Sequence, residues 1–124
     1  AGESATFAIT LREERLLIGA IGLTFAERHH RAEMGYWIAA DRWGQGYGTE
    51  AARAVLRYAF AERGLHKVMA THLAPNVASG RVMLKIGMSQ EGVQREHVLK
   101  NDRYEDLVLY GILREEWERQ QGES

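Results

Sequence analysis

The chain has 124 residues, of which 45% are hydrophobic and 27% charged, with a formal net charge of -1 and no cysteine. These values fit one globular domain over residues 1–124, exclude a disulfide framework, a thiol nucleophile and a zinc–thiolate site, and argue against a nucleic-acid partner. Because no apolar run approaches the ~20 residues of a membrane span, we expect no membrane partner and take a cytoplasmic location as the default.

Three strands are predicted in the first third of the chain. Residues Ala5 to Arg12 alternate between apolar and polar, which predicts a strand with one buried face. Further apolar runs cover Leu16 to Phe25 and Ala32 to Ala40. Short polar breaks separate the three runs, so we predict an antiparallel meander.

The rest of the chain alternates between helices and strands. The predicted elements are a helix at Thr49 to Arg63, a strand at Lys67 to Leu73, a helix at Val77 to Ile86, strands at Met88 to Lys100 and Arg103 to Leu113, and a polar helical tail at Arg114 to Gln121. The order β-β-β-α-β-α-β-β indicates a single α+β domain with a mixed sheet.

A glycine-rich segment lies between the third strand and the first helix. It reads Trp43-Gly44-Gln45-Gly46-Tyr47-Gly48-Thr49-Glu50-Ala51. Glycines let successive backbone N–H groups converge on a ligand, and the helix that follows adds unpaired N–H groups and a partial positive charge. This arrangement predicts a site for a phosphate or pyrophosphate, and the alternative is a tight turn that holds no ligand.

Two common phosphate-binding motifs fit this segment poorly. A P-loop ends in Gly-Lys-Ser/Thr, whereas Gly48-Thr49-Glu50 has no lysine. A dinucleotide fingerprint needs the spacing G-x-G-x-x-G inside a parallel β-α-β unit, whereas the spacing here is G-x-G-x-G after strands that read as antiparallel.

The glycine segment resembles the acetyl-CoA loop of N-acetyltransferases of the GNAT superfamily, in the form found in the RimJ/RimL-like branch of ribosomal-protein N-terminal acetyltransferases. The similarity extends over about residues 5 to 113 and includes Ala32 to Ile38, Asn76-x-x-Ser79, Lys85 to Met88 and Asn101-Asp102-x-Tyr104-x-Asp106. It implies a mixed, mostly antiparallel sheet flanked by helices. It also implies acetyl-CoA as co-substrate, no metal, and transfer of acetyl to a primary amine by direct attack in a ternary complex.

The sequence also departs from the family pattern. Trp43 stands where the superfamily loop usually begins with Gln or Arg, and Met83 replaces a tyrosine that serves many members as general acid. The family's N-terminal strand and helices, which build part of the acceptor pocket, are not recognised in this sequence. A non-catalytic acyl-CoA-binding or partner domain is therefore the alternative to an enzyme.

The resemblance implies a set of cofactor-binding residues. The backbone amides of the loop would hold the pyrophosphate, the edge of the third strand would hydrogen-bond the pantetheine arm, and the start of the second helix would lie at its end. The residues are Gly44, Gln45, Gly46, Tyr47, Gly48 and Thr49 in the loop, Trp37, Ile38 and Ala39 on the strand, and Asn76 and Ser79 on the helix. Asn76 is equally suited to capping the helix.

Acetyl transfer needs a base for the amine and stabilisation of the departing thiolate. The resemblance implies Glu33 as general base, with a solvated strand residue as the alternative. Ser79 is expected next to the thiol, with helix packing as the alternative. The five histidines form no metal pattern, and His72, on the strand before Asn76, is a second choice of base.

Tyr104 and Asp106 are expected to shape the acceptor site, with an exposed strand face as the alternative. By resemblance the acceptor is a protein N-terminal amine, while a polyamine or an aminoglycoside-like amine remains open because fold and cofactor do not fix the acceptor. Homodimers are common among members of the family, so a homodimer is an open alternative to a monomer.

Overall fold

The computed structural model describes residues 4–11, 16–39, 42 and 44–122, so Arg12, Ala40 and Trp43 lie outside the described residues. The strands are β1 (Ser4–Leu11), β2 (Leu16–Ala26), β3 (Arg31–Ile38), β4 (Lys67–Leu73), β5 (Ser89–Lys100) and β6 (Arg103–Leu113). The helical elements are η1 (Glu27–His29), α1 (Tyr47–Arg57), η3 (Tyr58–Glu62), α2 (Val77–Lys85) and α3 (Arg114–Gly122). The predicted order of strands and helices is confirmed.

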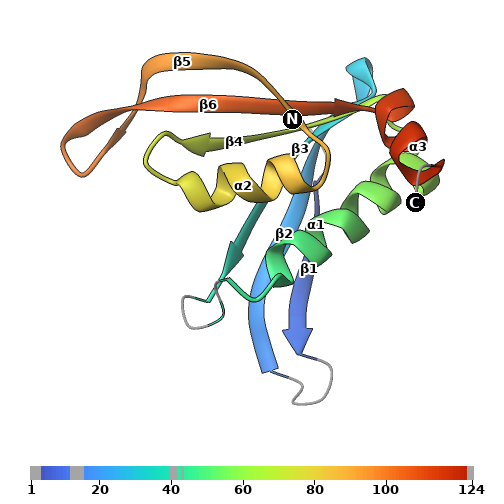
Figure 1. The fold of residues 1–124 in the computed structure, drawn as a ribbon. Helices are drawn as coiled ribbons and strands as arrows, with labels where there is room; N and C mark the ends of the chain where they lie inside the picture. Colours follow the sequence, from blue (N-terminus) through green and yellow to red (C-terminus); the bar gives the residue numbers. More distant parts are fainter. Residues whose placement is uncertain (1–3, 12–15, 40–41, 43, 123–124) are drawn as a thin grey trace.

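The six strands form one sheet in the order β1-β2-β3-β4-β6-β5 (Figure 1). Neighbouring strands are antiparallel except β3 and β4, which are parallel. The predicted meander is therefore confirmed for β1 to β3, and the predicted mixed, mostly antiparallel sheet is confirmed for the described chain. A parallel pair needs a crossover connection, which α1 and η3 provide.

One hydrophobic core lies between the sheet and the helices. Helices α1 and α2 lie over the same face of the sheet (Figure 1). Alternate residues of the central strands, such as Met34 and Val68, pack against Leu56, Phe60 and Met83 of the helical layer. The apolar residues that recur every second position along the strands and every 3.6 positions along the helices thus form one apolar layer. No helix in the described part of the chain is long and apolar enough to cross a membrane.

Strands β3 and β4 separate beyond their first half. Their register runs from Arg31↔Lys67 to Met34↔Ala70 and then ends. Beyond Met34, β3 stays paired with β2, and beyond Ala70, β4 stays paired with β6, so each keeps its other neighbour. The two strands point in clearly different directions in Figure 1, and we call the place where their backbone pairing ends the opening between β3 and β4.

Two local details differ from the sequence predictions. The helix predicted to reach Arg63 changes to π-helical geometry over η3, a change that a periodic pattern does not reveal. In the β1–β2 pair, the register shifts because Ile18 of β2 has no partner on β1, so the bulge lies on β2, while the alternation predicted for β1 is kept at Ala5, Ile9 and Leu11. Phe7, predicted to face the core, is 37% exposed and packs edge-on against Tyr58.

Candidate functional site

The opening between β3 and β4 is bordered by the N-terminal ends of both main helices. Helix α1 follows the glycine loop that β3 leads into, and α2 follows the turn at the end of β4. Each helix N-terminus presents unpaired backbone N–H groups and a partial positive charge. The candidate site extends from the loop, across the edge of β3, to α2.

The glycine loop has the backbone geometry of a ligand cradle. Gly44 and Gly46 have φ values of 78° and 84°, which favour glycine. A Cβ added at either residue would meet no atom within 4 Å, so the space beside them is open to a ligand. Gly46 is the N-cap of α1, no side chain caps this helix, and its first helical hydrogen bond runs from Glu50 N to Gly46 O at 3.0 Å. These features fit a pyrophosphate.

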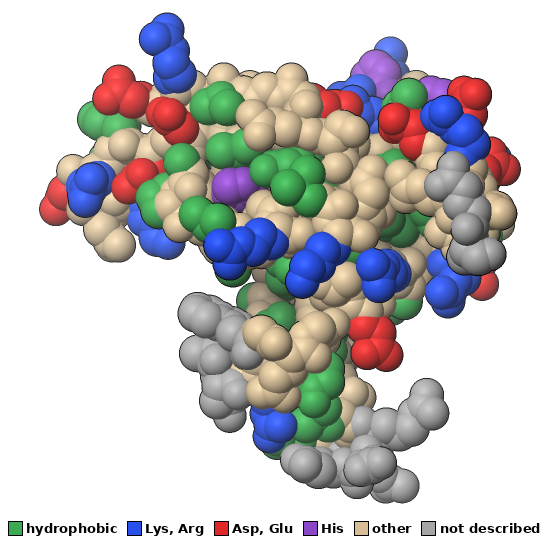
Figure 2. All heavy atoms as spheres, in the orientation of Figure 1, with side chains coloured by type: hydrophobic (Ala, Val, Ile, Leu, Met, Phe, Trp, Pro, Cys, Tyr) green, Lys and Arg blue, Asp and Glu red, His purple; other side chains and the backbone are tan. Residues whose placement is uncertain are grey.

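Basic side chains lie on the solvent face of the helices that flank the loop. Figure 2 shows Lys and Arg side chains in a row over α2 and α1. The exposed cations on these helices are Arg53, Arg57, Arg81 and Lys85. Arg53 Nη2 also donates to Lys85 O at 3.2 Å, which ties α1 to the end of α2. A row of cationic side chains of this kind suits an anionic ligand.

The open edge of β3 differs from the predicted one by one residue. Ala39 N donates to Ile18 O at 2.7 Å, and Ala39 O accepts from Arg42 N at 2.9 Å, so both backbone groups of Ala39 are engaged within the chain. Antiparallel hydrogen-bonded pairs recur every second residue, so Trp37 also directs its backbone groups to β2. The residues whose backbone groups point toward the opening are Tyr36 and Ile38. This corrects the predicted roles of Trp37 and Ala39.

Asn76 and Ser79 form a compact hydrogen-bonded pair at the start of α2. Asn76 is the N-cap, and its Oδ1 accepts from Ser79 N at 3.3 Å. Its Nδ2 donates to Ser79 Oγ, also at 3.3 Å. The predicted capping role is confirmed. Since Ser79 Oγ already accepts from Asn76, the hydroxyl proton of Ser79 is available to a second partner.

Tyr36 is a site residue that the sequence analysis missed. Its hydroxyl oxygen lies 3.5 Å from Ser79 Oγ, although 43 residues separate the two. Its ring lies beside Gly48, where an added Cβ would be 3.4 Å from Tyr36 Cε2. Tyr36 therefore connects the start of α1 with the start of α2 across the opening. A tyrosine at the end of an apolar strand looks like a packing residue in the sequence, so no local signal pointed to it.

Glu33 and Ser79 lie on opposite sides of the sheet. Met34 faces the core beneath the helices, so its neighbours Glu33 and Gly35 face the other way. Glu33 is exposed, and no ion pair of the described residues holds its carboxylate. It pairs with Met69, directly before the last pair of β3 and β4, Met34↔Ala70.

Asp106 and Tyr104 lie on the β5–β6 hairpin beyond β4. Asp106 Oδ1 accepts from Glu96 N at 2.8 Å, where β5 has a register shift and Glu96 has a φ of 48°. Asp106 O accepts from Ala74 N at 2.9 Å, which places this residue beside the turn before α2. Tyr104 is 64% exposed further along the hairpin. Thus Asp106 has a structural contact that the sequence did not indicate.

His72 lies on the core face of β4 and is nearly buried. Its Nδ1 lies 2.7 Å from Leu73 O and its Nε2 lies 3.4 Å from the Tyr110 hydroxyl oxygen. Both ring nitrogens thus have partners inside the chain, so the alternative of His72 as the base is not supported. In the described residues, no group of three or more His, Cys, Asp or Glu side chains is arranged to hold a metal ion.

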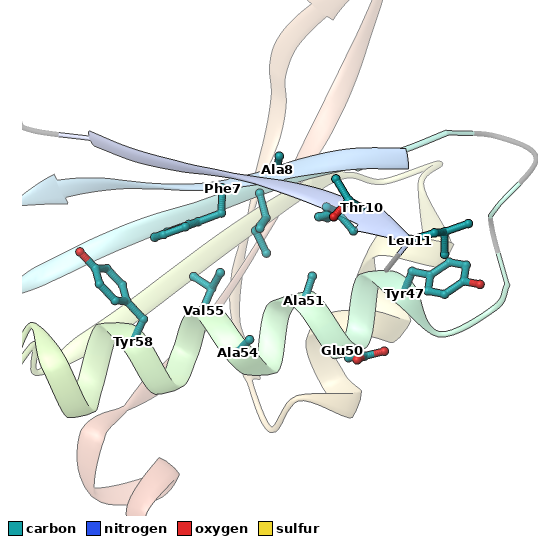
Figure 3. Close-up of a pocket in the computed structure, with 12 residues that line it drawn as sticks. Phe7, Ala8, Thr10, Leu11, Tyr47, Glu50, Ala51, Ala54, Val55 and Tyr58 are labelled. Carbon is teal, nitrogen blue, oxygen red and sulfur yellow. The ribbon is translucent and has the colours of Figure 1, made fainter. Parts of the chain in front are cut away.

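Two hollows lie apart from Ser79 and Asn76. A groove of about 680 Å³ runs between β1 and α1, lined by Phe7, Leu11, Ala51 and Tyr58 among others (Figure 3). It shares only Tyr47 with the predicted site. A shallower hollow of about 440 Å³ lies against Gly22, Gly35 and Trp37 on the side of the sheet that carries Glu33. Neither hollow contains Ser79.

Sequence and structure comparisons identify relatives of the whole described fold. Residues 1–89 match the family described as acetyltransferase (GNAT) domain. The uncharacterized N-acetyltransferase YnaD of Bacillus subtilis (strain 168) is 40% identical over 111 residues, which are 90% of this chain and 65% of that protein. The [ribosomal protein uS5]-alanine N-acetyltransferase of Escherichia coli (strain K12) is 26% identical over 118 residues, which are 94% of this chain and 61% of that protein.

A solved structure has the same fold. A mutant of the spermidine N-acetyltransferase SpeG from Vibrio cholerae aligns with a TM-score of 0.88 at 24% identity, covering 95% of this chain and 70% of that chain. This chain spans less than two thirds of the length of the two curated relatives named above. The family match covers most of the chain, and the ribosomal-protein relative supports the branch that the motifs indicate. The chain belongs to the GNAT acetyltransferase domain family.

Proposed function

We propose that residues 1–124 form one acetyl-CoA-binding domain that transfers acetyl to a primary amine. The observation that carries this proposal is the end of the β3–β4 pairing at Met34 and Ala70, between the N-terminal ends of α1 and α2. An extended ligand can add to a strand edge of this kind, with its phosphates at one helix and its reactive end at the other.

Each part of the ligand has a counterpart in the chain. The loop from Gly44 to Thr49 would hold the pyrophosphate through backbone N–H groups. The edge of β3 at Tyr36 would hydrogen-bond the pantetheine amides, and Asn76 retains one N–H and one lone pair for the same purpose. Ser79 would then lie near the thioester sulfur.

The proposed chemistry uses residues on both sides of the opening. Glu33 accepts the proton that the ammonium group loses, directly or through water, since only the neutral amine attacks. The amine nitrogen then bonds to the acetyl carbon while the carbon–sulfur bond breaks, and the nitrogen, which becomes positively charged on attack, releases its second proton to solvent water. Ser79 donates its hydroxyl proton in a hydrogen bond to the departing sulfur, which solvent finally protonates. Much of the rate acceleration comes from holding both substrates in one orientation.

The acceptor that we propose first is the N-terminal amine of a protein. The E. coli relative is named for an alanine of ribosomal protein uS5, and the sequence motifs resemble the same branch. The acetyltransferase from V. cholerae, which shares the fold, is named for spermidine, so a polyamine is the second acceptor to test. In either case we propose that the amine enters through the hollow beside Trp37, on the Glu33 side of the sheet.

Calorimetric titration with acetyl-CoA, with ATP and NAD as controls, tests the binding site. We expect saturable binding of acetyl-CoA and none of the controls. Gly46→Ala should weaken binding, because a methyl group at positive φ is strained and enters the space beside the loop. Gly122→Ala, an exposed position where the added Cβ meets nothing, is the matched control. Equal binding by Gly46→Ala would refute the loop as the phosphate site.

Two substitutions separate an enzyme from a binding module. Glu33→Gln and Ser79→Ala should each lower turnover of N-terminal peptides or spermidine by about 10²-fold, with acetyl-CoA affinity nearly unchanged. Ser89→Ala, an exposed serine on β5, is the control for Ser79. A protein that binds acetyl-CoA but acetylates neither class of amine would favour the acyl-CoA-binding alternative.

A further inference from the structure

A buried polar pair lies beneath α2. His72, on β4, is 9% exposed, and Tyr110, on β6, is 5% exposed. Their rings are 5.5 Å apart between centroids, as expected of diagonal neighbours on adjacent antiparallel strands. Polar groups at such depth are costly unless they are hydrogen-bonded, so the contacts of this pair define its geometry.

The contacts of His72 determine which nitrogen carries the proton. Nδ1 is 2.7 Å from Leu73 O, and a carbonyl oxygen can only accept, so Nδ1 is the donor. In the neutral ring Nε2 is then an acceptor. The Tyr110 hydroxyl, 3.4 Å away, donates to it. One carbonyl, one imidazole and one phenol thus form an ordered chain under the helix.

Helix α2 rests on this pair through Gly80. A Cβ added at Gly80 would lie 2.8 Å from His72 Nε2 and 3.1 Å from the Tyr110 hydroxyl oxygen, closer than side chains normally pack. Glycine is a poorer helix former than alanine. Its presence inside a helix of nine residues is explained by the close approach of helix and pair.

The same contact determines where Ser79 stands. Ser79 directly precedes Gly80, and its backbone and side chain are both held by Asn76. The first turn of α2 is therefore one unit whose height above the sheet depends on Gly80. A shift of this turn would move Ser79 Oγ relative to Tyr36 and to the edge of β3.

We propose that His72 and Tyr110 are positioning residues that set the height of α2 and so the position of the Ser79 hydroxyl. The positioning is inferred from the contacts of His72, Tyr110 and Gly80, and its effect on turnover rests on the proposed function of Ser79. Neither residue touches the reacting groups in this proposal.

Nuclear magnetic resonance tests the geometry without any turnover. The imidazole nitrogen shifts of His72 should report a proton on Nδ1, and Tyr110→Phe should move the Nε2 resonance. Gly80→Ala should shift the amide resonances of Ser79 and Asn76, whereas Gly122→Ala should leave them in place. A proton on Nε2, or unchanged Ser79 and Asn76 amides in Gly80→Ala, would overturn the proposal.

Measurements of turnover test whether the position of α2 affects acetyl transfer. Gly80→Ala should reduce acetyl transfer by about 10- to 100-fold, the scale of a misplaced catalytic group, while acetyl-CoA affinity stays nearly unchanged. The thermal midpoint should fall as well, because the methyl group crowds a buried contact, so activity is compared below the midpoint of the variant. Gly80→Ala combined with His72→Ala should be more active than Gly80→Ala alone, because the shorter side chain makes room for the methyl group. If the fold-losses of activity caused by Gly80→Ala and by His72→Ala multiply in the double variant, the two sites are independent and the coupling is refuted.

The two proposals fail in different ways. If the unaltered protein binds acetyl-CoA but transfers no acetyl group, the proposed function fails, and the resonances of Ser79 and Asn76 still decide the positioning. If the unaltered protein is active and Gly80→Ala is equally active, the positioning fails and the proposed function stands.

Discussion

Asn76 shows how one side chain organises the α2 end of the site. Its carbonyl oxygen satisfies a backbone N–H at the start of the helix, and its amide nitrogen binds the hydroxyl oxygen of Ser79. An asparagine can do both because it carries an acceptor and two donors on one rigid group. Capping and the proposed contact with acetyl-CoA would therefore be combined in a single residue, and substitutions can separate them.

Asn76→Ala should lower the free energy of unfolding by about 1 kcal/mol, because the helix loses its N-cap. Asn76→Asp keeps an oxygen for Ser79 N but has no N–H for Ser79 Oγ. We expect Asn76→Asp to be nearly as stable as the unaltered protein but to bind acetyl-CoA more weakly. Urea unfolding and calorimetry measure the two effects.

Asn101→Asp is the matched control for this pair, since Asn101 lies in the β5–β6 turn away from α2. It should change neither stability nor affinity. If Asn76→Asp were as unstable as Asn76→Ala, the cap would not depend on the side-chain oxygen.

At the scale of elements, the β5–β6 hairpin is shaped by its turn and by one carboxylate. Asn101 and Asp102 have φ values of 51° and 63°, as in the two-residue turns that match strand twist. On β5, before this turn, the register with β6 shifts between Gln94 and Val98. Asp106 holds the shifted segment by accepting from Glu96 N. The hairpin thus has a defined shape next to the turn before α2.

Asp106→Ala should loosen this segment, because one hydrogen bond worth about 0.5–1.5 kcal/mol is lost. Asp106→Asn keeps an oxygen acceptor and should retain the shape. Hydrogen exchange at the Glu96 amide should accelerate in Asp106→Ala and not in Asp106→Asn. Asp102→Asn removes the same charge at the turn and serves as the control.

The same variants test the proposed acceptor role of Asp106. If its carboxylate attracts the amine, Asp106→Asn should raise the apparent KM for the amine while the hairpin stays intact. An unchanged KM in Asp106→Asn, together with faster exchange in Asp106→Ala, would leave Asp106 with a structural role alone.

At the scale of the whole molecule, one core joins both halves of the sheet. Phe60 is fully buried, packs against Trp117 of α3 with ring centroids 5.4 Å apart, and lies in the same cluster as residues of β2, β3, β4 and β6. Arg114 of α3 also donates to Phe60 O. The helical layer therefore ties together the strands on either side of the opening.

Phe60→Ala should lower the free energy of unfolding by about 3–5 kcal/mol, through lost apolar burial and the cavity that remains. Urea unfolding followed by tryptophan fluorescence and by circular dichroism measures this loss. Coincident curves for the two probes are expected of a single domain. Leu84→Ala, at an exposed position of α2, should stay within about 0.5 kcal/mol of the unaltered protein. Separate transitions would contradict a single domain.

The sequence by itself determined the order of the elements, the glycine loop before α1 and the cap at Asn76. These features depend on residues close together in the chain: a period of two or 3.6, glycines at positive φ, and an asparagine three residues before the N–H that it binds. Local chemistry is sufficient for them, and the bounds of β4, β6 and α2 agree with prediction to within one residue.

Only the tertiary structure decided which groups face the opening. Whether Trp37 or Tyr36 presents its backbone there depends on the register with β2, and a shift of one residue reverses the answer. The contact of Tyr36 with Ser79 joins residues 43 positions apart, and the burial of His72 requires β6 beside β4 and α2 above them. Such contacts follow from the packing of distant elements, which no local pattern of residues records.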